Sequence, residues 1–193
     1  MGIDPIRLFG NWNEGYALDK HTLQSIPSGE DIYGHMLFDT TRSELGELVY
    51  QFKYQNNYDK LKEIMKLVIP FLDTWSVIKS VNAILPVPSS KKDRIYQPTC
   101  EIAYQIAAYL GINYFDDVLQ KVSEVQAKGM TQEEKNKIKG TIIATQKGRR
   151  QYNILLVDDL YQSGMTLHEC VNALKEDKNI NHIYVLAMTK TKG

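Results

Sequence analysis

The sequence predicts an α/β fold with a central, mostly parallel sheet flanked by helices, preceded by a small N-terminal segment. Three observations support this prediction: a strand, helix, strand order near the C-terminus, amphipathic helical spacing in the middle of the chain, and an ordinary globular composition. At 193 residues the chain is long enough for one sizeable core. We therefore expect one main unit over residues 41–193 and an accessory segment over residues 1–40.

The N-terminal third divides into a polar part and a helical part. Residues 1–40 are rich in Gly, Asn and Asp with isolated aromatic residues, and the run Pro27, Ser28, Gly29 is a turn signal. We expect hairpins or a lid there. Apolar residues then recur three and four positions apart over 43–52 and 58–72, which predicts two amphipathic helices.

The middle of the chain alternates strand and helix signals. The apolar run over 81–87 is interrupted and followed by prolines, so it predicts a short buried strand whose hydrogen-bond ladder stops there. Helical spacing over 97–110 is closed by Gly111, and residues 112–122 are expected to be extended.

The C-terminal part carries the clearest topological signal. Residues 153–157 (NILLV) predict a buried strand, residues 165–175 a helix, and residues 182–188 a final strand. A strand, helix, strand unit of this length implies parallel pairing in an α/β sheet.

Charge and cysteine content narrow the function classes. The 23 basic and 23 acidic residues cancel, which argues against a cationic coat for nucleic acid or membrane, although residues 121–150 hold eight Lys or Arg against three Glu. Cys100 and Cys170 are too isolated to build a disulfide framework or a zinc ribbon. Together with the lack of a long apolar run or a signal-peptide pattern, this predicts a cytoplasmic protein that does not bind membranes.

The chemistry is concentrated in residues 154–167, ILLVDDLYQSGMTL. Asp158 and Asp159 leave the C-terminal end of the predicted strand, where open α/β sheets place their ligands. Ser163, Gly164 and Thr166 follow at a helix N-terminus, which is an anion site. Carboxylates beside a phosphate cradle suit a ligand with hydroxyls next to its phosphate, and a ribose 5-phosphate fits both halves.

Two alternatives remain for this segment. A buried strand that ends in Asp-Asp also occurs in Walker B and receiver-like sites, but the chain has no GxxxxGK[ST] motif. The other alternative is a solvated turn whose hydroxyl groups only cap the helix.

Residues 157–166, VDDLYQSGMT, resemble the signature with which type I phosphoribosyltransferases bind phosphoribosyl pyrophosphate (PRPP). The resemblance extends over roughly residues 45–190 and is greatest to the ComF-like branch, through ILPVPSSKKDRIYQPTCEIAYQIA at residues 84–107. It implies the fold of that family, with residues 1–40 as a hood-like segment. ComF-like proteins usually begin with a zinc module, which this chain cannot form, so the resemblance implies no firm link to DNA uptake.

The resemblance also implies roles for individual residues. Asp158 and Asp159 would hold the ribose hydroxyls and take any catalytic role. The segment that wraps the 5′-phosphate would comprise Tyr161, Gln162, Ser163, Gly164, Met165 and Thr166. Pyrophosphate would be bound by Ser89, Ser90, Lys91 and Arg94, and a flexible loop over 123–140 would contribute Gln126, Lys128 and Lys137. For both basic segments the alternative is a solvated surface loop.

The implied activity is transfer of a phosphoribosyl group from PRPP, with Mg²⁺, to a nitrogenous base or amine, with release of pyrophosphate. It belongs to nucleotide metabolism in the broad sense, and the acceptor is not identified. Two alternatives stay open: a PRPP-binding regulator without catalysis, and a ComF-like role with single-stranded DNA, which the near-zero net charge disfavours. A homodimer is one of the oligomeric states left open.

Overall fold

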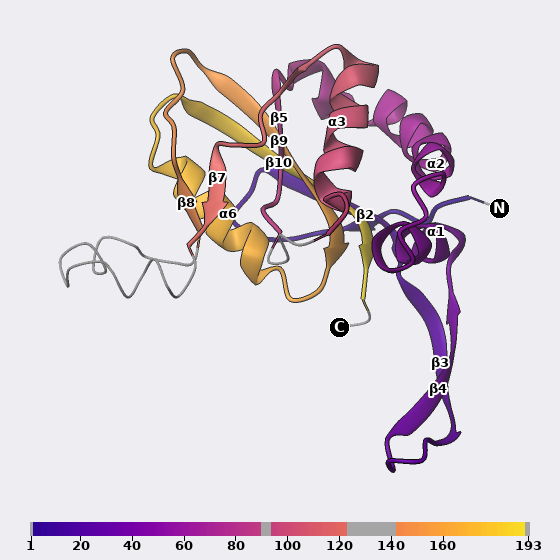
Figure 1. Ribbon diagram of the computed structural model, residues 1–193. Helices are drawn as coiled ribbons and strands as arrows, with labels where there is room; N and C mark the ends of the chain where they lie inside the picture. The colour runs from indigo at the N-terminus through magenta and orange to yellow at the C-terminus, as the bar shows by residue number, and fades with distance from the viewer. Residues whose placement is uncertain (1, 90–93, 123–141, 192–193) are drawn as a thin grey trace, which may run out of the picture.

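A six-stranded sheet forms the centre of the computed structural model, which describes residues 2–89, 94–122 and 142–191 (Figure 1). The strand order is β1-β2-β10-β9-β5-β6, and every pair is parallel except β1 with β2. The predicted α/β class with a mostly parallel sheet is therefore confirmed. The strands are β1 Ile6–Arg7, β2 Glu14–Lys20, β5 Ala83–Pro86, β6 Asn113–Tyr114, β9 Tyr152–Tyr161 and β10 Ile180–Lys190.

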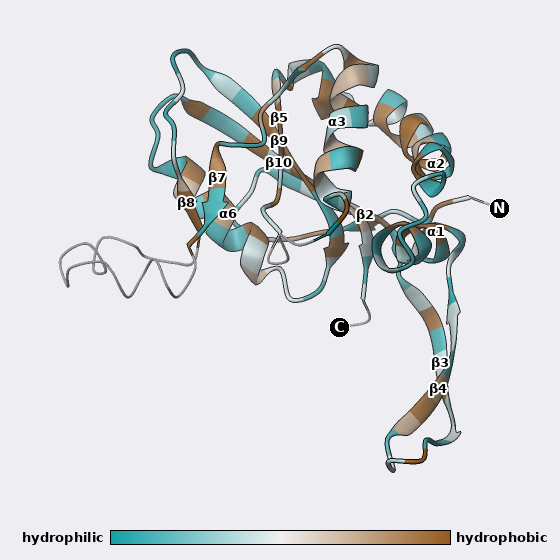
Figure 2. Ribbon diagram, viewed as in Figure 1, coloured by the Kyte–Doolittle hydropathy of each residue, from teal (hydrophilic) through white to brown (hydrophobic). Residues whose placement is uncertain are grey.

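Helices cover both faces of this sheet (Figure 1). Among the described residues, α1, α2, α3 and a 3₁₀ helix pack on one face, and α6 lies on the other beside a small antiparallel ribbon, β7–β8. In Figure 2 the apolar residues follow the sheet and the helix faces turned toward it. These elements are α1 Glu44–Tyr54, α2 Lys60–Thr74, the 3₁₀ helix η1 Ser76–Ser80, α3 Pro98–Leu110, β7 Leu119–Lys121, β8 Ile142–Ala144 and α6 Met165–Lys175.

The core has two halves because side chains alternate between the two faces of each strand. Leu155 and Val157 of β9 pack into the half formed with α1, α2 and α3, whereas Ile154 and Leu156 pack into the half formed with α6. All four are buried. A strand buried on both faces has a continuous run of apolar residues, as residues 154–157 show.

The elements match the sequence-based expectations to different degrees. The helix predicted over 165–175 has the observed bounds of α6. The strands predicted over 153–157 and 182–188 are longer in the structure. The extended segment predicted over 112–122 forms two short strands, β6 and β7.

Residues 1–40 contribute to two different parts of the molecule. Strand β2 pairs with β10 in the central sheet, and β1 pairs with β2. The division of the chain at residue 40 stays a prediction, but these two strands join the main sheet.

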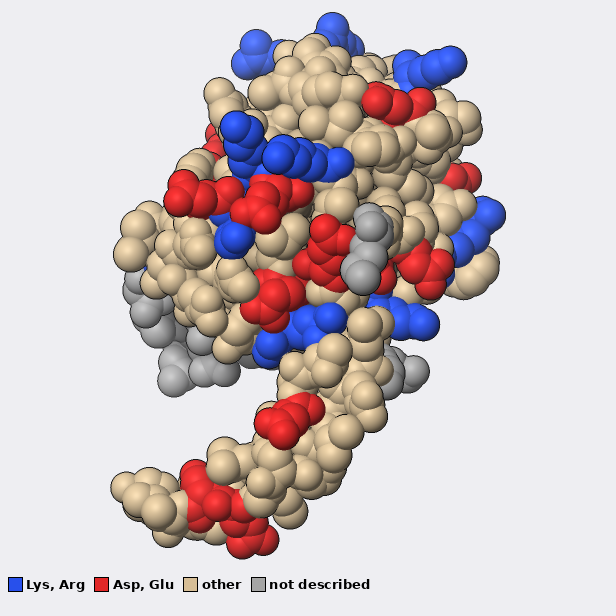
Figure 3. Space-filling model, turned by 90° about the vertical axis from the view of Figure 1, so that its right-hand side faces the viewer, with Lys and Arg blue, Asp and Glu red and all other residues tan. Residues whose placement is uncertain are grey.

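The rest of the N-terminal segment is a two-stranded hairpin, β3 Thr22–Glu30 and β4 Met36–Arg42, which we call the arm. The arm projects away from the body of the protein (Figure 1). It carries Glu30, Asp31 and Asp39 but no Lys or Arg between residues 21 and 41, and Figure 3 shows acidic atoms along it.

No helix in the described part of the chain is long and apolar enough to cross a membrane.

Candidate functional site

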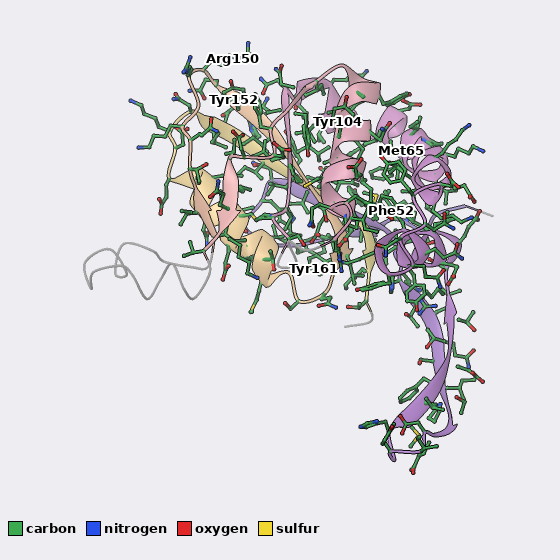
Figure 4. All side chains as sticks on the ribbon, viewed as in Figure 1. Phe52, Met65, Tyr104, Arg150, Tyr152 and Tyr161 are labelled. Carbon is green, nitrogen blue, oxygen red and sulfur yellow. The ribbon has the colours of Figure 1, made fainter. Side chains whose placement is uncertain are left out.

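Strand β9 carries the two candidate acids farther than the sequence predicts. The strand continues through Asp158 and Asp159 to Tyr161, because β10 pairs with it as far as Lys190. The acids therefore lie on strand backbone, and the connection to α6 is only residues 162–164. Figure 4 shows Tyr152 and Tyr161 at opposite ends of β9.

Gly164 closes this short connection, and its backbone conformation favours glycine there. Its φ of 77° lies in the left-handed region, which residues with a Cβ rarely adopt. A Cβ on Gly164 would also lie 2.6 Å from the Tyr161 hydroxyl oxygen. The turn thus brings the start of α6 directly beside the end of β9.

The N-terminus of α6 has the properties of an anion site. Its first-turn amides have no acceptor within the helix, and the N-cap residue Gly164 has no side chain to accept from them. One of these amides, Met165 N–H, donates a long hydrogen bond of 3.4 Å to Ser163 Oγ. The helix dipole adds positive potential at the same place. A bound anion would accept hydrogen bonds from these amides.

Two adjoining cavities open at this end of the sheet. The larger, about 300 Å³, lies between the end of β9, the loop after β5 and the end of α1, and the smaller, about 80 Å³, lies against the turn before α6. Both are bordered by Asp158, Leu160, Gln162 and Thr166. A ligand with one group in each cavity would therefore contact both the acids and the helix N-terminus.

The two acids differ in their surroundings. Asp158 Oδ1 accepts the Asp159 backbone N–H at 2.9 Å. Burial, and next the neighbouring carboxylate of Asp159, raise the pKa of Asp158 to about 7. Asp159 instead accepts a hydrogen bond at 2.7 Å from Lys53 Nζ, and both side chains are largely buried. At neutral pH, Asp158 is thus close to its titration point, whereas Asp159 forms an ion pair with Lys53.

Most of the predicted ligand-binding residues in the described ranges gather around these cavities. The larger cavity is lined by Ser89 and Arg94 together with Asp158 and Asp159. The remaining predicted residues of the phosphate segment line the smaller cavity: Tyr161, Gln162, Ser163, Gly164, Met165 and Thr166. Ser90, Lys91, Gln126, Lys128 and Lys137 lie outside the described residues.

Sequence reasoning missed one wall of the larger cavity. Lys53 and Tyr54, at the end of α1, line it, and so does Thr99 in the first turn of α3. A lysine in the last turn of an amphipathic helix normally indicates a solvent-exposed residue that interacts favourably with the helix dipole. Only the packing of α1 against the sheet brings Lys53 to Asp159, 106 residues later in the chain.

The acids fit a magnesium ion in one respect. No group of three or more His, Cys, Asp or Glu side chains that could hold a metal ion occurs among the described residues. Mg²⁺, however, is commonly bound by one or two carboxylates together with substrate phosphates and water. Of the described residues at the two cavities, Asp158 and Asp159 are the carboxylates that would hold such an ion.

Comparisons with known proteins add little to this geometry. No known protein family matches the chain, and no protein of curated function matches it. Among solved structures, the chain is similar to an adenine phosphoribosyltransferase, with a TM-score of 0.42 and 12% identity over 85% of this chain and 84% of that one. A likeness at this level supports no statement about the activity of this chain.

Proposed function

We propose that this protein binds PRPP and Mg²⁺ and transfers the phosphoribosyl group to a nitrogen nucleophile. The observation that carries the proposal is the junction of the two cavities: Asp158 lines both of them, Asp159 lines the larger one, and the N-terminus of α6 borders the smaller one. A purely anionic ligand would be repelled by the carboxylates, whereas a phosphorylated sugar offers hydroxyl donors to the acids and phosphate oxygens to the amides. The resemblance of residues 157–166 to the PRPP signature supports the same assignment.

In this proposal the 5′-phosphate occupies the smaller cavity. The amides of α6 bind it, and Ser163 and Thr166 add hydroxyl donors. Asp158 and Asp159 accept hydrogen bonds from the ribose 2′ and 3′ hydroxyls. Ser89 and Arg94, across the larger cavity, face the diphosphate.

The reaction is a displacement at C1 of the ribose. The nitrogen lone pair forms the new C1–N bond, the bond from C1 to the diphosphate oxygen breaks, and its electron pair leaves with pyrophosphate. The nitrogen releases its proton to water. Mg²⁺, when bound, neutralises charge on the leaving diphosphate. The protein orients the sugar with its carboxylates and stabilises the leaving anion with its cations.

Binding of PRPP with Mg²⁺, measured by calorimetry, tests the ligand assignment. We expect Asp159→Asn to weaken binding by about 10 to 100-fold, the loss that follows from one charge-assisted hydrogen bond. Asp73→Asn is the matched control, because Asp73 lies at the end of α2 and accepts a hydrogen bond from Tyr109 away from the cavities. Equal affinity of the wild type and Asp159→Asn would remove the ribose contact from the proposal.

Turnover separates the enzyme from its main alternative. Incubation with PRPP, Mg²⁺ and a panel of nucleobases and amines should release pyrophosphate. PRPP binding without release across a broad panel would favour a regulator that keeps the binding site but lacks catalysis. The ComF-like branch and a link to single-stranded DNA remain predictions from the sequence.

A further inference from the structure

Lys53 is a largely buried cation at the candidate site that the PRPP signature does not include. Its side chain is 15% exposed and that of Asp159 only 7%, with 2.7 Å between Nζ and Oδ1. Removing two charges from water costs free energy that their attraction does not always recover. The pair therefore need not stabilise the fold. Because both residues line the larger cavity, a role in ligand binding is the other explanation for their burial.

The helix that carries Lys53 is held in place at both ends. At its start, Gly46 packs so closely on the chain that an added Cβ would lie 2.2 Å from the His21 carbonyl oxygen. At its end, the Tyr96 hydroxyl donates to the Phe52 carbonyl, and the two rings stack with centroids 4.8 Å apart. These contacts at both ends position the helix backbone that carries Lys53.

A second cation stands on the same wall of the cavity. Lys53 Nζ and the Arg94 guanidinium carbon lie 5.6 and 5.7 Å from the centroid of the Tyr54 ring. All three residues line the larger cavity together with Asp158 and Asp159. The cavity therefore has an acidic wall from β9 and a cationic wall from α1 and the segment before α3.

We propose that Lys53 binds the diphosphate of the ligand and that, without ligand, it is held by Asp159. This inference rests on the proposed function, because it assigns Lys53 to the diphosphate end of PRPP. When a sugar diphosphate enters, Asp159 exchanges the ammonium for ribose hydroxyls, and the ammonium moves to phosphate oxygens. Lysine suits this exchange, since its charge is compact and its stem is flexible.

When Lys53 moves from Asp159 to the diphosphate, neither the ammonium nor the carboxylate is left without a partner. An ionised Asp159 beside a diphosphate would otherwise add repulsion to the ligand's own negative charge. With Lys53 between them, the carboxylate keeps hydrogen-bond donors and the diphosphate gains a counter-ion. Lys53 is therefore a binding residue whose loss affects one end of the ligand more than the other.

The test compares three probes by calorimetry on the wild type and on Lys53→Met: PRPP with Mg²⁺, inorganic pyrophosphate with Mg²⁺, and ribose 5-phosphate. We expect Lys53→Met to weaken PRPP and pyrophosphate by about 10 to 100-fold. Ribose 5-phosphate has no diphosphate and should change by less than about threefold. Lys60→Met is the matched control, because Lys60 pairs with Glu63 at 2.7 Å on α2 and does not line either cavity.

Each other outcome overturns a defined part of the argument. Unchanged PRPP affinity in Lys53→Met removes the Lys53 contact but leaves the proposed function intact, whereas a wild type that binds no PRPP removes both. An equal loss for all three probes means that Lys53 acts only by supporting the structure. If circular dichroism shows that Lys53→Met does not fold, Lys53→Gln is measured instead, because its amide still donates to a carboxylate, and the same outcomes apply.

Discussion

Strands β9 and β4 are both rich in apolar residues but have opposite surroundings. In β9, Leu155 and Leu156 are completely buried, because β5 and β10 pair with the strand and helices cover both faces. In β4, Leu37 and Phe38 are 48% and 54% exposed, because the strand pairs only with β3 and no described part of the chain covers the arm.

This difference shows where the folding free energy of the molecule comes from. Burial of one leucine side chain contributes about 1.5 to 3 kcal/mol relative to its exposed state. The central sheet buries many apolar side chains and gains this free energy for each of them, whereas most side chains of the arm are exposed and gain little. An isolated two-stranded hairpin is at best marginally stable in water, so the arm adds little to the stability of the body.

The largest expected effect is in the central sheet. Leu156→Ala should lower the free energy of unfolding by about 2 to 5 kcal/mol, since it removes buried surface and leaves a cavity. Leu37→Ala in the arm is the matched control and should stay within about 0.5 kcal/mol. Urea unfolding of both variants measures the contrast, and similar losses at the two positions would contradict it.

A smaller effect is expected at the junction of arm and body. The buried Ser43 accepts the Gly46 N–H at 3.0 Å as the N-cap of α1 and donates to the Lys20 carbonyl. Ser43→Ala should cost about 1 to 2 kcal/mol in urea unfolding. Ser25→Ala removes an exposed hydroxyl that lies 3.1 Å from Thr40 Oγ1 in the arm, and a comparable cost there would show that the arm supports the body.

At the candidate site we expect a substitution that stabilises the protein. Because the pKa of Asp158 is raised to about 7 in the folded state, the folded protein holds a proton that the unfolded chain loses near pH 4. This contribution to stability is present below about pH 4 and disappears as the pH rises to about 7. Asp158→Asn should therefore raise the free energy of unfolding at pH 8 by about 1 to 2 kcal/mol.

The pH profile of urea unfolding measures this effect. The difference between Asp158→Asn and the wild type should grow between pH 4 and pH 7, and a constant difference would contradict the assignment. Burial lowers the pKa of His21, which contributes with the opposite sign, since its stabilisation is lost as the pH falls. His21 is present in both proteins, so it largely cancels from the comparison.

The smallest effect is expected from removal of most of the arm. Replacement of residues 25–40 by an Asn-Gly turn should change the free energy of unfolding by less than about 1 kcal/mol, because these residues bury little surface. PRPP affinity should change by less than about twofold, since no arm residue lines either cavity. A lower turnover with intact PRPP binding would instead support the hood-like role that the resemblance implies for residues 1–40.

Local patterns in the sequence predicted those elements whose buried face can be recognised from the order of apolar residues within the element itself. The run at residues 154–157 and the periodicity at 165–175 each predict one element, because the apolar side chains there leave few other ways to be buried. The turn at Gly164 is also a feature that the local sequence indicates, since its glycine and hydroxyl residues lie close together in the chain. Placement of β2 beside β10 was not predictable in this way, because its partner is far away in sequence.

The sequence by itself determined the α/β class, the C-terminal strand, helix, strand unit and the order of acids and helix N-terminus along the chain, because all of these depend on neighbouring residues. Only the tertiary structure decided that β9 continues through the acids, that the arm stands free of the body, and that Lys53 reaches Asp159. These features depend on contacts between segments far apart in the chain. Side-chain periodicity shows which face of an element is buried but carries no information about the partner that buries it.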